Sequence, residues 1–475
     1  MQINNKKIGS EFLKSAFQKE GLFIKTEDVV TWLYEQNKKV HVNINKTTFD
    51  QLNNWRYKNG RLCHESGKFF SIDGIRVNTN WGTKSEWEQP IINQPEIGYL
   101  GFIVKKINGV LHFLVQAKIE PGNVNYVQLS PTLQATKSNY TQVHKGKTPH
   151  YLEFFKDAKP EQILVDQLQS EQGARFLRKR NRNIIIYLKE EVPLYENFTW
   201  LTLAQIKDLM VFDNLVNMDT RTVIAGISYV AGREQEVFYF NECNKNIQKN
   251  NIYSKFLKSA LYANDSFHAF DNIMAFLTKY KSNYDLSLEF VDLKALDKWV
   301  FTDDVIRHID NKYFEVIPVE VEIENREVFS WSQPLVHPLQ EGLCAFVCKE
   351  INGLMHFAVQ AKLECGNHDI IEFSPTVQCL TGNYRDTAKG ALPFLDYVLN
   401  VSEELVVFDT LQSEEGGRFY KEQNRNMLVL ADDSITLELP ENYIWMTLNQ
   451  MFMFLKFNNF FNIQARSLIA AVKFV

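Results

Sequence analysis

The stretch that decides the fold reads Gln116-Ala117-Lys118-Ile119-Glu120-Pro121-Gly122-Asn123, and a close copy begins 244 residues later at Gln360. It lies in the window from Gly98 to Tyr140, where roughly half of the positions are identical to those from Gly342 to Tyr384. Similarity at a fixed offset is typical of a duplicated structural unit. The sequence therefore predicts one module written twice.

The repeat extends to both ends of the chain. The matched pairs share residue type and order, and they include Trp55 with Trp299, His64 with His308, Arg182 with Arg425 and Arg221 with Arg466. The polar run Asn241 to Asn246 is where one copy should stop. We therefore expect an N-terminal module at 1–243 and a C-terminal module at 244–475.

Composition excludes several functional classes. The chain has 475 residues, of which 45% are hydrophobic and 23% charged, which is typical of a globular protein with two or more domains. The net charge of -5, with basic residues scattered among acidic ones, argues against nucleic acid as a partner. No leading apolar segment and no run of about eighteen apolar residues is present, so we expect a cytoplasmic protein without a membrane partner. The six cysteines lack the paired spacing of a zinc site, so no metal is expected.

The hydrophobic periodicity changes along each copy. Residues 12–38 carry apolar positions at helical spacing, which predicts two short helices. Residues 98–118 predict a β-hairpin that turns at Asn108-Gly109, and the second copy repeats it at Asn352-Gly353. Short strands and a helix capped by Thr202 follow. Each module is therefore predicted to be α+β, with a mixed sheet and flanking helices.

Polar residues concentrate after the second hairpin strand. Gln116, Lys118 and Glu120 alternate with apolar residues and should therefore share one face of the sheet. The residues that follow add more hydrogen-bonding groups, namely Asn123, Gln134, Asn139, Tyr140 and His144. A ligand pocket accounts for this density, although the same groups could instead satisfy turn backbones and one another at a sheet edge.

Longer motifs resemble a known family. Gln116 to Asn123, Leu129-Ser130-Pro131-Thr132, Asp166 to Gly173, and Asp213 to Arg221 closely resemble the nucleotide-diphosphate hexose 2,3-dehydratases. The resemblance covers nearly the whole chain and includes Ser413 to Tyr420 in the second copy. It implies a tandem duplication in which each half is similar to the Nudix hydrolase scaffold, usually assembled as a homodimer.

The resemblance also implies a reaction. The family removes the hydroxyl at sugar carbon 2 of a dTDP-linked 4-keto-6-deoxyglucose and leaves a 3,4-diketo-2,6-dideoxy sugar, without a cofactor. Its labile product implies prompt use by a 3-ketoreductase. Such chemistry needs a base for the proton at carbon 3, a donor to the ketone oxygen and an acid for the departing hydroxyl.

The catalytic candidates are few. His64 is our first choice for the base because its unperturbed pKa lies near neutrality, although a lone His beside a strand is often only packed. Tyr140 and His144 are candidate acids. Lys118 suits the ketone oxygen, with Glu120 orienting it.

The binding candidates are more numerous. Arginines could hold the diphosphate and tryptophans could stack on the base, although a solvated charge run and core packing are the plain alternatives. The expected substrate-binding residues are Arg76, Trp81, Trp87, Gln116, Asn123, Gln134, Asn139, Gln169, Glu171, Arg175 and Arg182. The expected residues of a degenerate or supporting pocket in the second copy are His308, Lys362, Tyr384, Arg418 and Arg425.

Comparing the copies favours the first as the working site. His144 faces Ala388, Arg76 faces Glu320 and Pro121 faces Cys365, so the first copy keeps the fuller motif. One departure from the family is Gln142, where an Arg is common. Two other classes stay open: a catalytically silent nucleotide-sugar binding protein, and a Nudix-type hydrolase, whose glutamate-rich metal box is not found here.

Overall fold

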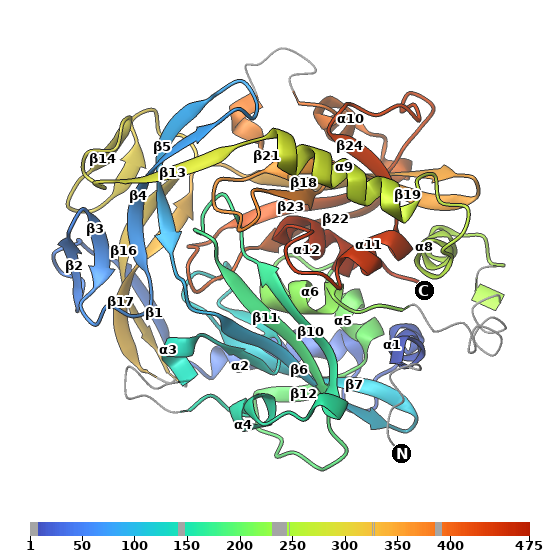
Figure 1. Ribbon diagram of the computed structural model, residues 1–475. Helices are drawn as coiled ribbons and strands as arrows, with labels where there is room; N and C mark the ends of the chain where they lie inside the picture. The colour runs from blue at the N-terminus through green and yellow to red at the C-terminus, as the bar shows by residue number, and fades with distance from the viewer. Residues whose placement is uncertain are drawn as a thin grey trace.

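Two large mixed sheets and two small antiparallel sheets make up the protein (Figure 1). The computed structural model describes residues 8–140, 148–229, 245–246, 248–324, 326, 328–384 and 392–475. Most of the expected boundary run from Asn241 to Asn246 therefore lies outside the described residues. No helix among the described residues is long and apolar enough to cross a membrane.

The large sheet of the first module has seven strands in the order β10-β11-β6-β7-β12, with β8 beside β7 and β9 beside β6. Strands β6 and β11 run parallel, and the other pairs are antiparallel. The bounds are β6 Gly98–Ile107, β7 Val110–Ile119, β8 Val127–Ser130, β9 Leu133–Ala135, β10 Ile163–Ser170, β11 Arg180–Tyr187 and β12 Phe198–Leu201. The predicted hairpin and mixed sheet are confirmed.

The second module repeats this sheet as β20-β19-β18-β23-β22, with β21 beside β18 and β24 beside β19. Its bounds are β18 Gly342–Ile351, β19 Leu354–Leu363, β20 Ile371–Ser374, β21 Val377–Leu380, β22 Val406–Ser413, β23 Gln423–Leu430 and β24 Tyr443–Thr447. The hairpins turn at Asn108 and Asn352, both with positive φ, a conformation that Asn tolerates better than most residues.

The small sheets exchange strands between the modules. Strand β1 of the first module pairs with β16 of the second, and β13 of the second pairs with β4 of the first. One small sheet contains β2 Trp55–Lys58, β3 Arg61–His64, β4 Ser71–Thr79, β5 Glu86–Asn93 and β13 Leu286–Val291. The other contains β1 Val42–Lys46, β14 Trp299–Phe301, β15 Ile306–His308, β16 Phe314–Ile323 and β17 Ser330–Pro338. The modules are therefore consecutive in sequence but interlocked in space.

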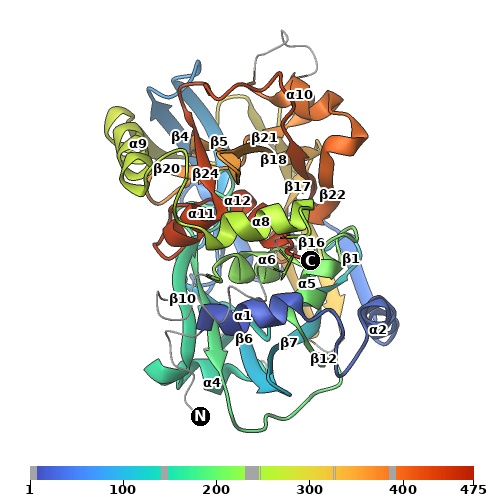
Figure 2. The same ribbon diagram turned by 90° about the vertical axis from the view of Figure 1, so that its right-hand side faces the viewer.

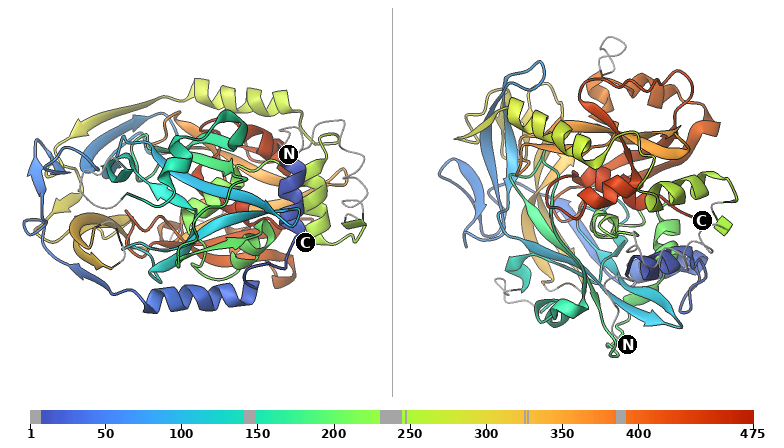
Figure 3. Two further views of the ribbon diagram at one scale, coloured as in Figure 1. Left: turned by 90° about the horizontal axis from the view of Figure 1, so that it is seen from below. Right: turned by 45° about the vertical axis from the view of Figure 1, so that its right-hand side comes forward.

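The helices follow the same repeat. The bounds are α1 Ile8–Phe17, α2 Thr26–Lys38, α3 Lys137–Tyr140, α4 Leu152–Lys156, α5 Leu203–Leu209, α6 Met218–Ala225, α8 Ile252–Leu261, α9 Phe270–Asn283, α10 Leu395–Asn400, α11 Leu448–Phe454 and α12 Ile463–Ala471, with 3-10 turns at Pro160–Gln162, Thr381–Tyr384 and Glu403–Leu405. The expected helices within 12–38 and the N-cap at Thr202 are confirmed, because α1 and α2 fall there and the Thr202 side chain accepts from Gln205 N. Helices α2 and α9 lie on opposite sides of the molecule, as the repeat requires (Figure 3).

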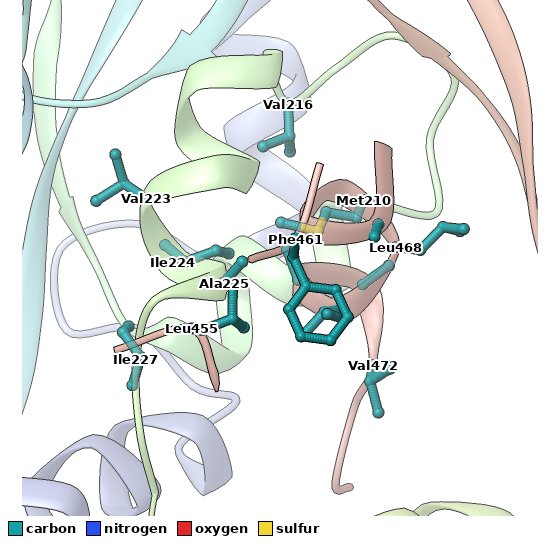
Figure 4. Packing of buried hydrophobic residues seen from close by; sticks show 14 of the residues in the cluster. Met210, Val216, Val223, Ile224, Ala225, Ile227, Leu455, Phe461, Leu468 and Val472 are labelled. Atoms are coloured by element: carbon teal, nitrogen blue, oxygen red, sulfur yellow. The ribbon is translucent and has the colours of Figure 1, made fainter. Parts of the chain in front are cut away.

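Helices α6 and α12 occupy the centre, between the two large sheets (Figure 2). Their apolar side chains pack into one core cluster that both modules share. Ala225 of α6 and Leu468 of α12 lie on either side of Phe461, which precedes α12 (Figure 4). Because this core is continuous, the two modules form a single packed unit.

Candidate active site

A cavity of about 650 Å³ opens between the modules. Its charged lining residues come from both copies and are Lys118, Glu120, Glu171, Lys179, Asp219, Arg326, Glu415 and Arg418. Four basic and four acidic side chains therefore face one space. Such a concentration of titratable groups in a cavity is typical of a functional site.

Aromatic side chains form another part of the lining, namely Trp55, His64, Phe69, Phe70, Phe176 and Trp331. The Trp55 Nε1 group donates to the Ser332 carbonyl at 2.9 Å, which joins the wall across the module boundary. The His64 ring lies 5.6 Å from Trp55 and 4.8 Å from Phe69, in edge contacts. Burial lowers the pKa of His64 despite the opposing effect of Glu65.

Lys118 and Glu120 stand together where β7 ends. The Lys118 Nζ group donates to the Gln134 carbonyl at 2.9 Å and lies 3.3 Å from Glu120 Oε1. Arg326, from the second module, lies 3.2 Å from the same carboxylate oxygen. Burial alone would raise the pKa of Glu120, but Arg326 and Lys118 outweigh it and lower that pKa. Glu120 is therefore held ionised.

Glu171 and Lys179 form a second charged group. Asn181 Nδ2 donates to Glu171 Oε1 at 2.6 Å, and the Glu171 amide donates to the Lys179 carbonyl at 3.0 Å. Burial raises the pKa of Glu171 in spite of Lys179 and Arg466. Burial likewise lowers the pKa of Lys179 to about 8, although Glu171 opposes the change.

Asp219 occupies the first turn of α6, directly after the N-cap Asn217. The residue is only 2% exposed, and its Oδ1 atom has no hydrogen-bond partner among the described residues. Burial, with added repulsion from Glu415 and Glu171, raises the pKa of Asp219 well above its usual value. Burial therefore favours the neutral carboxylic acid at Asp219, which is the form that can donate a proton into the cavity.

Glu415 enters the same cavity from the second module. Its Oε1 atom accepts the Gly417 amide at 2.7 Å. Burial raises the pKa of Glu415 to about 7, with Arg418 opposing and Glu120 and Glu171 adding to the rise. A carboxyl group with this pKa populates both forms near neutrality, which suits a general base.

The structure brings together six of the residues expected from sequence: His64, Lys118, Glu120, Gln134, Glu171 and Arg418. Arg418 was expected in the second-copy pocket, yet it lines this cavity because the module boundary runs through it. The loop from Glu415 to Arg418 crosses to the first module, where the Gly122 amide donates to the Gly416 carbonyl at 2.7 Å.

Other expected arginines are engaged outside the cavity. Arg182 and Arg425 each make two hydrogen bonds to a carboxylate, Asp166 and Asp409 respectively. Arg76 Nε donates to Glu88 Oε1 at 2.8 Å on the small sheet. These guanidinium groups are bound by nearby acids and do not line the cavity.

The remaining polar candidates also lie elsewhere. Gln116 pairs within the sheet with Ser130 and Phe198. Asn123 Nδ2 donates to the Tyr126 carbonyl at 2.7 Å, and Gln169 Nε2 donates to the Leu455 carbonyl at 3.2 Å. These residues hold turns and strands together.

Neither tryptophan that the sequence proposed for nucleotide stacking, Trp81 or Trp87, lines the cavity. Trp81 packs with its ring centroid 4.6 Å from that of Tyr284. Trp87 packs against an apolar cluster that contains Ile75 and Cys365. Trp331, which is the counterpart of Trp87, lines the cavity instead.

The remaining candidates of both copies are also not among the described residues that line the cavity. Lys362 Nζ donates to the Gln378 carbonyl at 2.7 Å, as Lys118 does to Gln134. Arg175 lies 4.1 Å over the Phe314 ring, and the His308 ring lies 5.2 Å from Tyr313. Tyr384 lies in the turn Thr381–Tyr384, and burial raises its pKa. Asn139 and Tyr140 lie in α3, and His144 lies outside the described residues.

Sequence reasoning missed most of the lining, including the charged residues Lys179, Asp219, Arg326 and Glu415 and the aromatic Trp331. Asp219 and Glu415 stood inside motifs already matched to the family, so a signal was present. No sequence signal marked Arg326, because the equivalent position in the first copy is Gly82 and the repeat does not preserve a basic residue there.

The two copies differ at several of these positions. At the offsets that align each segment, Lys179 faces Glu422, Asp219 faces Gln464 and Glu415 faces Gln172. The mirrored position therefore lacks counterparts of Asp219 and Glu415, although it keeps Glu414, whose pKa burial raises to about 8. The expectation that the first copy holds the working site stays a prediction.

The interlocked α+β modules and the cavity of titratable groups between them define a class of duplicated protein. Residues 26–227 and 270–472 each match the family model described as NDP-hexose 2,3-dehydratase, and the chain belongs to this family. A dTDP-4-dehydro-6-deoxy-alpha-D-glucopyranose 2,3-dehydratase of Saccharopolyspora spinosa is 41% identical over 472 residues, covering 97% of this chain and 94% of that protein. Similar proteins of the same name come from Streptomyces violaceoruber, at 40% identity with coverage of 93% and 96%, and from Amycolatopsis orientalis, at 37% with 96% and 92%.

Proposed function

We propose that this enzyme removes water from a dTDP-linked 4-keto-6-deoxyglucose by acid-base catalysis in the cavity between its modules. The observation that carries the proposal is the presence of Asp219 and Glu415 in one cavity. Burial raises the pKa of both carboxyl groups, which favours the proton-donating form of Asp219 and leaves Glu415, with a pKa of about 7, able to accept a proton. The names of the relatives supply the substrate.

The elimination begins at sugar carbon 3. The ketone at carbon 4 acidifies the carbon 3 proton, and Glu415, in its ionised form, accepts that proton. Lys118 donates a hydrogen bond to the ketone oxygen, where negative charge develops. Glu120, held ionised by Arg326, keeps Lys118 in place.

The departing group leaves from carbon 2. Protonated Asp219 gives its proton to the hydroxyl, which leaves as water and takes the electron pair of the broken bond. The enol at carbon 3 then tautomerises to a ketone. Substrate and product differ by one water molecule, so no redox cofactor enters the balance.

The aromatic part of the lining suits the nucleotide. Trp331 and Trp55 offer flat faces to a pyrimidine, and Arg418, stacked on Phe70, supplies positive charge for the diphosphate. His64 lies among these aromatic residues, and we assign it to nucleotide binding in preference to the base role.

Three wider features belong to the same proposal and rest on the family resemblance: a homodimer, a cytoplasmic location and a 3-ketoreductase that consumes the product. The similarity of each module to the Nudix scaffold stays a prediction.

The direct test is incubation of the purified enzyme with dTDP-4-keto-6-deoxyglucose while NMR follows the carbon 2 signals. We expect loss of the 2-hydroxyl in the wild type, and loss of this activity in Asp219→Asn and Glu415→Gln with dTDP binding retained. Binding without turnover in the wild type would identify a silent binding protein. Metal-dependent release of dTMP would identify a hydrolase.

A further inference from the structure

Two fully buried arginines cross the boundary between the modules. Arg221 of α6 and Arg466 of α12 are each 1% exposed. Burial of an arginine costs folding free energy unless its N–H groups all find acceptors. The acceptors of these two side chains therefore show which segments each arginine joins.

Arg221 joins the start of its own helix to two segments of the second module. Its Nε group donates to the carbonyl oxygens of Val216 at 3.2 Å and Asn217 at 3.4 Å, at the start of α6. One terminal nitrogen donates to the Ser413 carbonyl at the end of β22, and the other donates to the Ser467 hydroxyl. A planar guanidinium fixes both the distance and the angle between the groups that it bridges.

The start of α6 and the end of β22 carry the proposed acid and base. Asp219 lies in the first turn of α6, two residues before Arg221. Glu415 lies two residues after Ser413. Arg221 does not line the cavity itself, so it can act only through the residues that it positions.

We propose that Arg221 is the positioning residue that sets Asp219 and Glu415 against each other across the module boundary. The inference rests on the proposed function, because it needs these two carboxyl groups as the acid and the base. Displacement of reacting groups by about 1 Å can lower a rate by about 100-fold, so a rigid bridge has catalytic value.

The molecule contains its own matched control. Arg466 makes the mirrored contacts, donating to the Ser170 carbonyl across the boundary, to the Phe461 carbonyl and to Thr222 Oγ1 at 2.7 Å. Its helix presents Gln464 where α6 presents Asp219. Arg466 thus performs the same structural task without joining an acid to a base.

The test compares Arg221→Lys with Arg466→Lys in the full-length enzyme. Lysine keeps the charge but cannot bridge the same set of groups. We expect similar losses of thermal stability, a fall in kcat of about 100-fold for R221K against less than about tenfold for R466K, and KM within about threefold of wild type for both.

The pH profile separates positioning from plain stability. Because the charge of Glu415 raises the pKa of Asp219 more than does the charge of Glu171, which lies beside the serine held by Arg466, the alkaline limb of kcat should move to lower pH by more in R221K than in R466K. Equal kcat losses in the two variants, or an unmoved limb in R221K, would overturn the proposal.

A milder variant covers the case in which R221K does not fold. Ser467→Ala removes one hydrogen bond of Arg221 and leaves the arginine in place. It should lower kcat several-fold and move the same limb in the same direction; an unchanged profile contradicts the proposal. If the wild type dehydrates the substrate and D219N and E415Q do not, failure of these arginine tests removes only the positioning role.

Discussion

The guanidinium of Arg418 lies 4.2 Å from the centre of the Phe70 ring. A loop of the second module thereby contacts the first module at the cavity. The mirrored contact joins Arg175 to Phe314 at 4.1 Å. Both positions thus keep the arginine-aromatic contact, while Asp219 and Glu415 face only the first. The contact belongs to the shared framework, and we assign the proposed chemistry to the carboxyl groups.

The pH dependence of kcat should be bell-shaped. Glu415 must be ionised to accept a proton, so the rate should rise with pH through about 7. Asp219 must be protonated to donate one, so the rate should fall at higher pH, where it ionises. Glu415→Gln should lower kcat by about 10²- to 10⁴-fold and remove the acidic limb. A residual activity that keeps a limb near pH 7 would assign that limb to another group.

Removing Arg326 should make activity more sensitive to acid. Without its charge, burial raises the pKa of Glu120, and the carboxylate that holds Lys118 is lost as pH falls. Arg326→Gln should therefore lower kcat/KM more at pH 6 than at pH 8. Arg307→Gln, on the exposed side of β15, is the matched control and should leave the profile unchanged. Parallel profiles for wild type and R326Q would argue against this role.

Trp331 and Trp87 offer a direct comparison of equivalent residues. Trp331 lines the cavity and Trp87 packs beside Cys365, so Trp331→Leu should raise the Kd for dTDP by about tenfold, as loss of one stacking contact does. Trp87→Leu should lower the melting temperature with a smaller change in Kd. Calorimetric titration measures both constants. The reverse order would restore the expectation that Trp87 binds the nucleotide.

Stability should fall as pH rises through neutrality. Burial raises the pKa of Glu372 to about 7 from an unfolded value of 4.5, so its contribution is fully present below pH 4.5 and is lost as pH rises through 7. Glu372 accepts from Ser170 as Gln128 accepts from Ser413, so glutamine fits this position.

Urea unfolding at pH 5 and pH 8 measures this effect. In Glu372→Gln the fall in unfolding free energy between these pH values should be smaller than in wild type by roughly 2 to 3 kcal/mol. Glu320→Gln, on an exposed position of β16, should leave the fall unchanged. An equal fall in E372Q and wild type would mean that Glu372 is already ionised at pH 5.

The sequence predicted what local patterns determine. Residue spacing predicted the duplication, the hairpin at Asn108-Gly109 and the helix cap at Thr202. Lys118 and Glu120, which were expected in a ligand pocket, line the cavity. It could not predict which residues of the second copy enter that cavity, because an exchange of strands depends on long-range packing. Arg326 is the clearest case, since nothing near it in sequence marks it as part of a site.

The exchange of β1 and β13 bears on whether either half of the chain can exist alone. A single module would leave strand β16 or β4 without a neighbour that now comes from the other copy. A chain cut at the module boundary would therefore expose a bare strand edge on a small sheet, and it would need a second copy to cover that edge.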